Sequence, residues 1–243
     1  MSSGTAHKRS IGVENIRALA FDIFGTVVDW RGTIINEGLG LSKSVDWGSF
    51  ANDWMEGYRT QVERVRKGER PWAALDVFLG EVFVSLVIKY DLNTIPRSQL
   101  SAFATVWHRL NPWPDVIPGL IRLRRKFITG TLSNGNMILL VDMERHSDLR
   151  WDCVLSAELP KRYKPDREAY QIAVDYLGPS PEQVMYVASH QWDLSAGHET
   201  VGMRTAYISR PLEMGEPPSS DKPDPSYDIN AEDFEDLASQ LGC

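Results

Sequence analysis

The chain has 243 residues, enough for one large domain or for a core domain with a smaller inserted one. Its net charge is -7 and its pI is about 5.3. Nucleic acids and anionic membranes need a basic surface, so we expect neither as a partner. A small anionic substrate remains compatible with this charge, because it needs only a few local cations.

Cysteine usage and targeting signals narrow the class further. Cys153 and Cys243 show neither CxxC nor Cys/His spacing, which argues against a zinc site and a disulfide framework. Two such cysteines indicate a reducing compartment, and we expect a cytoplasmic location. Apolar runs such as 82–84 are far too short to span a bilayer. Residues 1–10 are polar, unlike a secretory signal, and we expect residues 1–14 to form a disordered tail.

The first predicted element is a buried strand over residues 18–21. Four apolar residues run into Asp22, and Gly25 and Thr26 follow as a turn. An Asp at the carboxyl end of a parallel strand points into the crevice where open α/β sheets bind their ligands. Asp22 is therefore a candidate nucleophile. The alternative from this stretch alone is an Asp that caps the turn through its side chain.

A helical region follows the first strand. Apolar residues recur at spacings of three and four in the stretches 50–65, 75–86 and 100–107, and Pro71 and Pro96 separate these stretches. Because strand patterns disappear here, the sequence predicts a helical cap domain inserted after the first strand. The predicted boundaries are 31–111 for the cap, with 15–30 and 112–243 as the core.

Strands and helices alternate in the second half of the chain, which predicts a parallel sheet with right-handed crossovers. The predicted strands are 127–132, 153–155, 184–188 and 205–208. The predicted helices are 118–126, 137–146, one through residue 177 and one after residue 193, with a final short helix at 234–241. The Pro- and Ser-rich segment 210–227 is expected to be an extended surface segment.

Polar residues follow several of these strands. Parallel strands bring their carboxyl ends to one edge, so we expect these side chains to converge. Each has an ordinary explanation by itself, such as a plain turn, an exposed lysine or a helix N-terminus, but their coincidence is harder to dismiss. The residues are Asp22, Thr26, Ser133, Asn134, Lys164, Ser189, His190 and Asp193.

In these motifs the chain resembles the haloacid dehalogenase superfamily, over about residues 17–210. The resemblance implies an α/β fold, with a Rossmann-like parallel sheet core and an inserted helical cap. It also implies that the first Asp attacks an electrophile, that Ser and Lys hold the anion, and that the last acidic residue supports water. The matching motifs are Asp22 with Gly25 and Thr26, Ser133-Asn134-Gly135, Lys164-Pro165-Asp166, and Asp193.

Two positions point to one branch of that superfamily. Its phosphatases resemble D-x-D-G-T at the first motif, where the second Asp protonates the leaving oxygen and helps to hold magnesium. Phe24 occupies this place, and the last motif, 188–193, has a single carboxylate. Phe24 instead suits a carbon electrophile whose leaving group needs no proton. The sequence looks most like the L-2-haloacid dehalogenase branch, with no metal or other cofactor.

The implied reaction has two steps. Asp22 displaces halide from the α-carbon of a small carboxylate substrate, and water positioned by Asp193 then hydrolyses the ester to a 2-hydroxy acid. Lys164 is expected to keep Asp22 ionised, since a nearby opposite charge lowers the pKa of a carboxylate. Ser133 would hold the substrate carboxylate, with Thr26 orienting groups around Asp22. Asn134 would share that orienting role. The resemblance also implies a homodimer.

The remaining candidate binding residues each have more than one expected role or none assigned. Met55 stands where the branch carries a halide-binding Arg, and Arg59 or Arg31 could reach the same space. His190 could stabilise a leaving group, bond to Asp193 or make a structural hydrogen bond. Tyr170 is either part of the polar network or an ordinary aromatic on a helix face. Ser189 and Trp192, which flank His190 in the last motif, complete the predicted binding residues.

Three other functions remain open. A related hydrolase could open a strained ring such as azetidine-2-carboxylate, because the missing Arg at Met55 fits a nitrogen leaving group. A phosphatase is disfavoured by Phe24. A binding protein that lost activity is disfavoured because Asp22, Ser133, Lys164 and Asp193 are all kept. The fold alone does not separate these functions.

Overall fold

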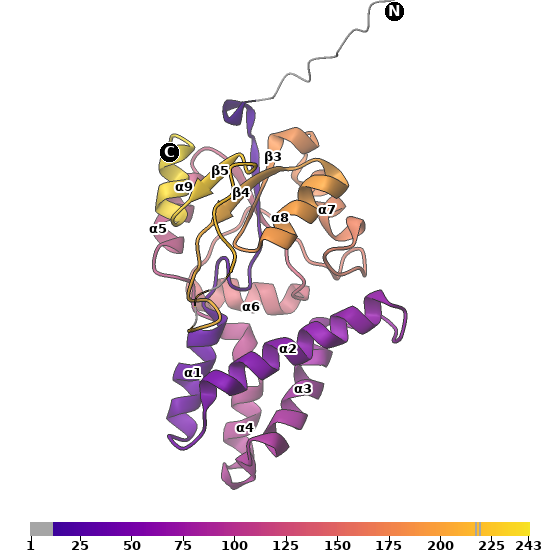
Figure 1. The fold of residues 1–243 in the computed structure, drawn as a ribbon, viewed down its shortest axis with the longest axis vertical. Helices are drawn as coiled ribbons and strands as arrows, with labels where there is room; N and C mark the ends of the chain where they lie inside the picture. Colours follow the sequence, from indigo (N-terminus) through magenta and orange to yellow (C-terminus); the bar gives the residue numbers. More distant parts are fainter. Residues whose placement is uncertain (1–11, 217, 219) are drawn as a thin grey trace, which may run out of the picture.

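The computed structural model describes residues 12–216, 218 and 220–243. A five-stranded parallel sheet in the order β2-β1-β3-β4-β5 forms the core, which confirms the predicted α/β class (Figure 1). All residues of β1 and β3 are buried, because helices cover both faces of the sheet. The strands are β1 (Ala18–Phe21), β2 (Ile128–Thr131), β3 (Val184–Ala188), β4 (Arg204–Ile208) and β5 (Ile229–Ala231).

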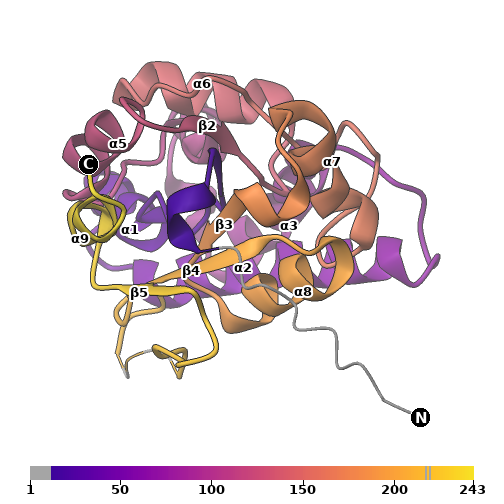
Figure 2. The same cartoon turned by 90° about the horizontal axis from the view of Figure 1, so that it is seen from above.

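Alternate strand residues supply two separate apolar layers. Leu19 and Phe21 of β1 pack on one face of the sheet, whereas Ala18 and Ala20 pack on the other. The first face is covered by α5 (Val116–Leu123), α6 (Met137–Ser147) and α9 (Phe234–Gln240), and the second by α7 (Arg167–Leu177) and α8 (Gln191–Val201) (Figure 2).

Residues 30–109 form the helical segment between β1 and β2, and no strand interrupts it. The segment lies beyond the carboxyl end of β1 in Figure 1. Buried aromatic rings hold it together, with Trp54 tilted against Phe83 at 5.0 Å and edge-on to Phe50 at 5.5 Å. The α-helices are α1 (Trp30–Leu41), α2 (Trp47–Arg66), α3 (Leu75–Lys89) and α4 (Arg97–Ala104).

Helix α1 was not predicted, because three glycines and an irregular apolar pattern conceal it. The Asp29 carboxylate accepts a hydrogen bond from the Gly32 amide at 2.8 Å and caps its first turn. Gly38 is needed because the Trp47 ring lies against it, so that a Cβ there would come within 2.2 Å of the ring. The predicted third helix of the segment also divides, since α4 ends at Ala104 and a 3₁₀ turn, Val106–Arg109, follows.

The predicted strand 153–155 is wrong as a regular strand. The Thr131 hydroxyl donates to the Leu155 carbonyl at 2.9 Å and accepts from the Leu155 amide at 2.8 Å. A side chain therefore replaces the backbone partner, and only isolated bridges remain at Cys153 and Ser156. Short 3₁₀ turns lie elsewhere, at Val13–Asn15, Leu92–Thr94 and Pro181–Gln183.

Other predicted boundaries also change. Helix α5 begins at Val116, two residues before the predicted start. Strand β5 was not predicted; its three residues are too few to show a pattern. Residues 1–11 of the predicted disordered tail lie outside the described residues. In the part of the chain that the structure describes, no helix is long and apolar enough to cross a membrane.

The segment after β4 is not wholly a surface segment, because Arg210 and Glu213 are buried. Arg210 donates to both carboxylate oxygens of Asp115, at 3.0 and 2.7 Å, and to the Thr26 carbonyl at 3.1 Å. A bidentate pair of this kind joins the segment to α5 and to the loop after β1.

Arg210→Met is expected to lower the free energy of unfolding by about 3 kcal/mol, because it leaves the half-buried Asp115 carboxylate without its cation. For a chain of this size the melting temperature should fall by roughly 6–12 °C. Arg150→Met is the control, since the Arg150–Asp148 pair is exposed and worth little. Equal melting temperatures for the two variants in calorimetry would contradict the structural role of Arg210.

Candidate active site

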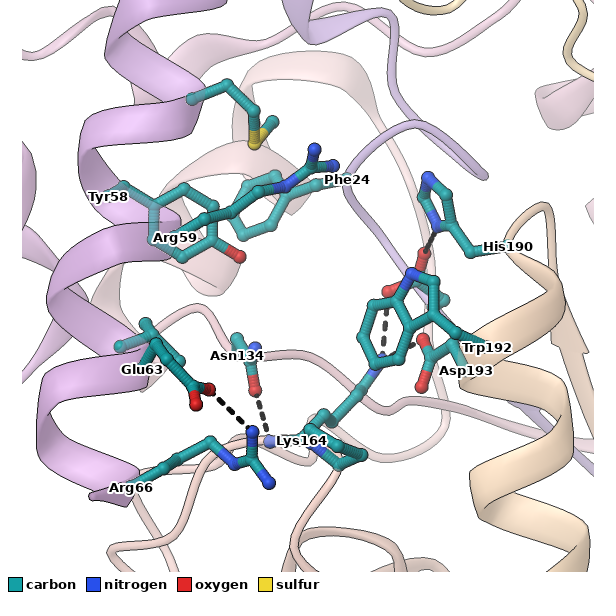
Figure 3. Close-up of a pocket in the computed structure, with 14 residues that line it drawn as sticks. Phe24, Tyr58, Arg59, Glu63, Arg66, Asn134, Lys164, His190, Trp192 and Asp193 are labelled. Carbon is teal, nitrogen blue, oxygen red and sulfur yellow. Dashed lines mark hydrogen bonds and ion pairs between the residues drawn. The ribbon is translucent and has the colours of Figure 1, made fainter. Parts of the chain in front are cut away.

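The site lies where the carboxyl ends of β1 and β3 face α2 of the helical segment. A cavity of about 250 Å³ opens there (Figure 3). The core contributes Asp22, Lys164, His190 and Asp193 to it, and α2 contributes both apolar and charged side chains. The residues that line it include Asp22, Phe24, Met55, Tyr58, Arg59, Asn134, Lys164, His190, Trp192 and Asp193.

Lys164 links the charged groups of the site. Its buried ammonium donates to Asp22 Oδ1 at 2.9 Å, to Asp193 Oδ2 at 2.9 Å and to the Tyr186 hydroxyl at 2.5 Å. All three N–H groups of Lys164 thus have partners. Burial by itself would lower the pKa of Lys164, but the charges of Asp193 and Asp22 raise it, so the ammonium stays charged.

Asp22 is ionised and held at both oxygens. Oδ1 accepts from Lys164, and Oδ2 accepts from the Thr26 hydroxyl at 2.8 Å. Burial alone would raise the pKa of Asp22, but the charge of Lys164, with His190, holds that pKa well below its usual range. Asp22 keeps 7% of its surface exposed, and it lines the cavity. It is therefore a carboxylate that a substrate can reach.

Asp193 is buried more deeply and serves as an anchor. Its Oδ1 accepts from the Tyr170 hydroxyl at 2.6 Å, and its Oδ2 accepts from Tyr186 at 2.6 Å and from Lys164. Burial and the charge of Asp193 raise the pKa values of both tyrosines, which therefore remain donors. Tyr170 thus belongs to the polar network. Tyr186 was missed, since a tyrosine inside a buried strand gives no sequence signal of its own.

The hydroxyl residues of the motifs lie around the charged groups. Thr26 accepts from the Ser189 amide at 2.9 Å, and its Oγ1 lies 3.0 Å from Ser189 Oγ. Ser133 accepts from the Gly135 amide at 3.0 Å. Ser133 and Ser189 are buried and are not among the residues that line the cavity. Asn134 does line it, and its Oδ1 accepts from the Lys164 backbone amide at 2.8 Å.

His190 is held by an acidic residue that the sequence did not single out. Its Nε2 lies 2.9 Å from Glu213 Oε2, and its Nδ1 lies 3.5 Å from Asp22 Oδ2. Burial would lower the pKa of His190, but the charges of Glu213 and Asp22 raise it to about 10. His190 is therefore an imidazolium at neutral pH. Glu213 was hidden by the Pro-rich, polar composition around it.

The part of the cavity wall around Phe24 is apolar. Phe24 packs edge-on against Trp107 at 5.5 Å and Tyr58 at 6.4 Å. Met55 is buried beside them. Arg59 projects from α2 into the cavity, and with the described residues it forms no hydrogen bond or ion pair (Figure 3). Its guanidinium is therefore available to an anion.

The edge of the cavity is formed by residues of both the core and α2. Trp192 lines the cavity with 48% of its surface exposed, and Arg66 of α2 pairs with Asp166 of the core at 2.8 Å. Two charged groups contact Asp22, Lys164 at 2.9 Å and His190 at 3.5 Å; both are cationic, and they would repel a divalent cation. Within residues 12–216, 218 and 220–243, no group of three His, Cys, Asp or Glu residues is arranged to hold a metal ion.

The parallel α/β fold and this site are those of a hydrolase with a carboxylate at the end of its first strand. A family model described as haloacid dehalogenase-like hydrolase matches residues 16–199, and the chain belongs to this family. The resemblance found in the sequence motifs is thereby confirmed.

Named relatives align with most of this chain. The chain is 28% identical over 222 residues to (S)-2-haloacid dehalogenase 4A of Burkholderia cepacia, and the alignment covers 90% of this chain and 93% of that protein. A solved L-2-haloacid dehalogenase is 36% identical with a TM-score of 0.87, covering 93% of this chain and 98% of that one. A solved defluorinating L-2-haloacid dehalogenase is 37% identical with a TM-score of 0.87, covering 94% and 96%.

The charge of His190 can be measured directly. With ¹⁵N-labelled histidine, its ring is expected to remain an imidazolium at pH 8 and to titrate near pH 10. Because the folded pKa exceeds the ordinary 6.5, the stabilisation from this charge is complete below about pH 6.5 and is lost as the pH rises through about 10. Glu213→Gln should lower the pKa of His190, and a neutral His190 ring in the parent protein at pH 7 would contradict the assignment.

Proposed function

We propose that this protein is a metal-independent 2-haloacid dehalogenase that converts 2-haloalkanoic acids to 2-hydroxy acids through an ester on Asp22. The observation that carries the proposal is the lone Asp22 carboxylate, kept ionised by the buried Lys164, beside an apolar Phe24. The names of the relatives support the same reaction.

In the first step an oxygen of Asp22 bonds to the α-carbon of the substrate, and the electron pair of the carbon–halogen bond leaves with the halide. The ionised state of Asp22 supplies the lone pair at neutral pH. Asn134 and the nearby cations Lys164 and His190 favour a substrate that is itself an anion. The partner is therefore a small carboxylate, with Ser133 supporting the turn beside it.

In the second step water attacks the Asp22 acyl carbon, and the 2-hydroxy acid leaves. Asp193 lines the cavity on the far side of Lys164 and is the carboxylate nearest to this chemistry. The split into two displacements makes each barrier lower than a direct attack of water on the carbon–halogen bond.

Phe24 decides between this reaction and phosphate hydrolysis. A phosphate ester needs a proton for its leaving oxygen, whereas halide departs as a stable anion. Phe24 supplies no proton, and its packing against Trp107 and Tyr58 keeps water away from the attacking carboxylate. The ring-opening alternative also needs a proton on nitrogen, and it receives no support from the relatives.

The departing halide needs a positive group on the side of the cavity away from Asp22. Met55 supplies none, and Arg59, one turn along α2, is directed into the cavity without a partner among the described residues. We assign the binding of the departing halide to Arg59. The exposed Trp192 ring and the Arg66–Asp166 ion pair lie at the edge of the cavity.

The proposal also includes the role of the helical segment, the location of the protein and its oligomeric state. The helical segment would act as a cap domain, with boundaries at 31–111, and the protein would act in the cytoplasm. It would be a homodimer, for which the exposed Val84 and Ile88 on one face of α3 offer an apolar surface.

The proposal is tested with a panel of 2-haloacids, azetidine-2-carboxylate and phosphate esters, each with and without EDTA. Halide release from a 2-haloacid is expected to continue in EDTA and to disappear in Asp22→Ala. A single turnover in H₂¹⁸O with enzyme in excess should place the label in the Asp22 side chain, found by mass spectrometry of its peptide, because water attacks the acyl carbon.

Two results would overturn the proposal. One is label that enters the hydroxy acid directly and never appears at Asp22. The other is an activity that EDTA abolishes and magnesium restores, which would make phosphate esters the expected substrates.

Arg59→Ala is expected to reduce kcat at least about tenfold, which corresponds to about 1.4 kcal/mol of transition-state stabilisation. Arg64→Ala is the matched control, because Arg64 lies on the same helix but is exposed and does not line the cavity. Steady-state halide release measures both variants, and unchanged turnover in Arg59→Ala would remove Arg59 from the reaction.

A further inference from the structure

Four side chains form a continuous line from the nucleophile into the protein. Asp22 Oδ2 lies 3.5 Å from His190 Nδ1, and His190 Nε2 lies 2.9 Å from Glu213 Oε2. The Trp30 indole donates to Glu213 Oε1 at 2.9 Å. The proposed reaction as described so far uses neither Glu213 nor Trp30. Burying a carboxylate costs free energy unless an opposite charge and hydrogen bonds compensate it.

Glu213 is fixed in place by its surroundings. Only 3% of its surface is exposed, and both of its carboxylate oxygens have partners. Gly25, at φ +88°, leaves the space that Glu213 fills, because a Cβ there would come within 2.1 Å of Glu213 Oε1. Glu213 also lies beyond residues 16–199, which the family model matches.

The two oxygens of Asp22 are held differently. Among the described residues, Oδ1 accepts only from Lys164, whereas Oδ2 faces both Thr26 and His190. Because the ionised Asp22 carboxylate can only accept, the Thr26 hydroxyl donates its proton to Oδ2, and Thr26 Oγ1 accepts from the Ser189 amide. Oδ2 therefore has one hydrogen-bond donor, Thr26, and a cationic ring nitrogen 3.5 Å away, His190; together they can stabilise an oxygen on which negative charge develops.

We propose that Asp22 Oδ1 forms the ester bond, that Thr26 and His190 hold Oδ2 as the oxyanion during ester hydrolysis, and that Glu213 positions His190 for this role. The proposal rests on the proposed function, since it assigns parts of the same covalent reaction. His190 is a catalytic residue in this assignment, and Glu213 and Trp30 are positioning residues.

The hydrolytic step balances as follows. The water oxygen bonds to Asp22 Cγ, one water proton passes to Asp193, and the carbonyl π pair moves to Oδ2. The pair then returns to re-form the carbonyl, the Cγ–Oδ1 bond breaks, and the departing alkoxide takes the proton from Asp193. The new carboxyl group releases the second water proton to solvent, which restores the Asp22 carboxylate.

The geometry favours this role for His190 over halide binding. In-line displacement places the leaving halide on the side of the α-carbon opposite the attacking oxygen, but His190 Nδ1 lies beside that carboxylate. The distance of 3.5 Å leaves room to shorten as charge builds on Oδ2, as catalytic hydrogen bonds commonly do. Glu213 takes no part in the ester bond, so His190 keeps this partner when Asp22 is esterified.

The test separates the two chemical steps in Glu213→Gln. Quench-flow measures halide release, and mass spectrometry of the Asp22 peptide measures the ester. Alkylation should stay within about twofold of the parent, whereas ester hydrolysis should slow at least about tenfold, because losing an oxyanion donor outright costs about 100–1,000-fold. The ester should accumulate in the steady state. Glu216→Gln, the same change at an exposed position three residues away, should behave as the parent.

Further variants distinguish positioning from a general structural effect. Trp30→Phe keeps a ring in the core but removes the N–H to Glu213, and it should slow ester hydrolysis in the same direction. His190→Gln keeps a neutral donor, and in that background Glu213→Gln should cost less than about twofold, because Glu213 acts through His190. Circular dichroism checks that each variant is folded.

Each contrary result has a separate meaning. Ester hydrolysis at the parent rate in both Glu213→Gln and Trp30→Phe overturns this inference and leaves the covalent reaction intact, as does a loss confined to alkylation. Full additivity of Glu213→Gln with His190→Gln also overturns it. Halide release with no ester at Asp22 in any of these proteins overturns the proposed function instead.

Discussion

The structure depends on one buried ammonium group. Lys164 holds Asp22 and Asp193, two carboxylates that would repel each other without it. Its third N–H group donates a hydrogen bond to the Tyr186 hydroxyl. Removing one partner of such a buried set leaves an uncompensated charge, which costs several kcal/mol. Because β1 and β3 are neighbours in the sheet, the loops that follow them bring the two carboxylates within reach of one lysine. The same contact keeps Asp22 ionised, so stability and reactivity have a common origin.

The core and α2 contribute different side chains to the site. The core supplies groups whose positions are fixed by strand ends, and α2 supplies Met55, Tyr58 and Arg59 to the opposite wall. In the proposed reaction, the apolar part of this wall would exclude water from the Asp22 carboxylate as it attacks carbon. The fold itself is compatible with several reactions. Phe24, which donates no proton and packs among aromatic rings, is the residue that separates carbon chemistry from phosphate chemistry here.

His190 and Glu213 connect the site to segments that local motifs do not describe. Glu213 joins the segment after β4 to Trp30, the first residue of α1, and so ties the helical segment to the core directly behind the nucleophile. Arg210, three residues earlier, makes a second connection through Asp115 and the Thr26 carbonyl. The loop that carries Asp22 and Thr26 is thus held by the ion pairs of Asp22 with Lys164 and His190 and by the hydrogen bond from Arg210 to the Thr26 carbonyl.

The sequence by itself determined the parallel sheet, the family and the convergence of Asp22, Lys164 and Asp193, because strand period and strand-end motifs are local signals. Only the tertiary structure decided that Ser133 and Ser189 lie outside the cavity, that Thr131 interrupts the predicted strand 153–155, and that Tyr186 and Glu213 belong to the site. Those facts depend on the direction of individual side chains and on pairs far apart in the chain. Trp30 and Glu213, 183 residues apart, share no local pattern that could reveal their contact.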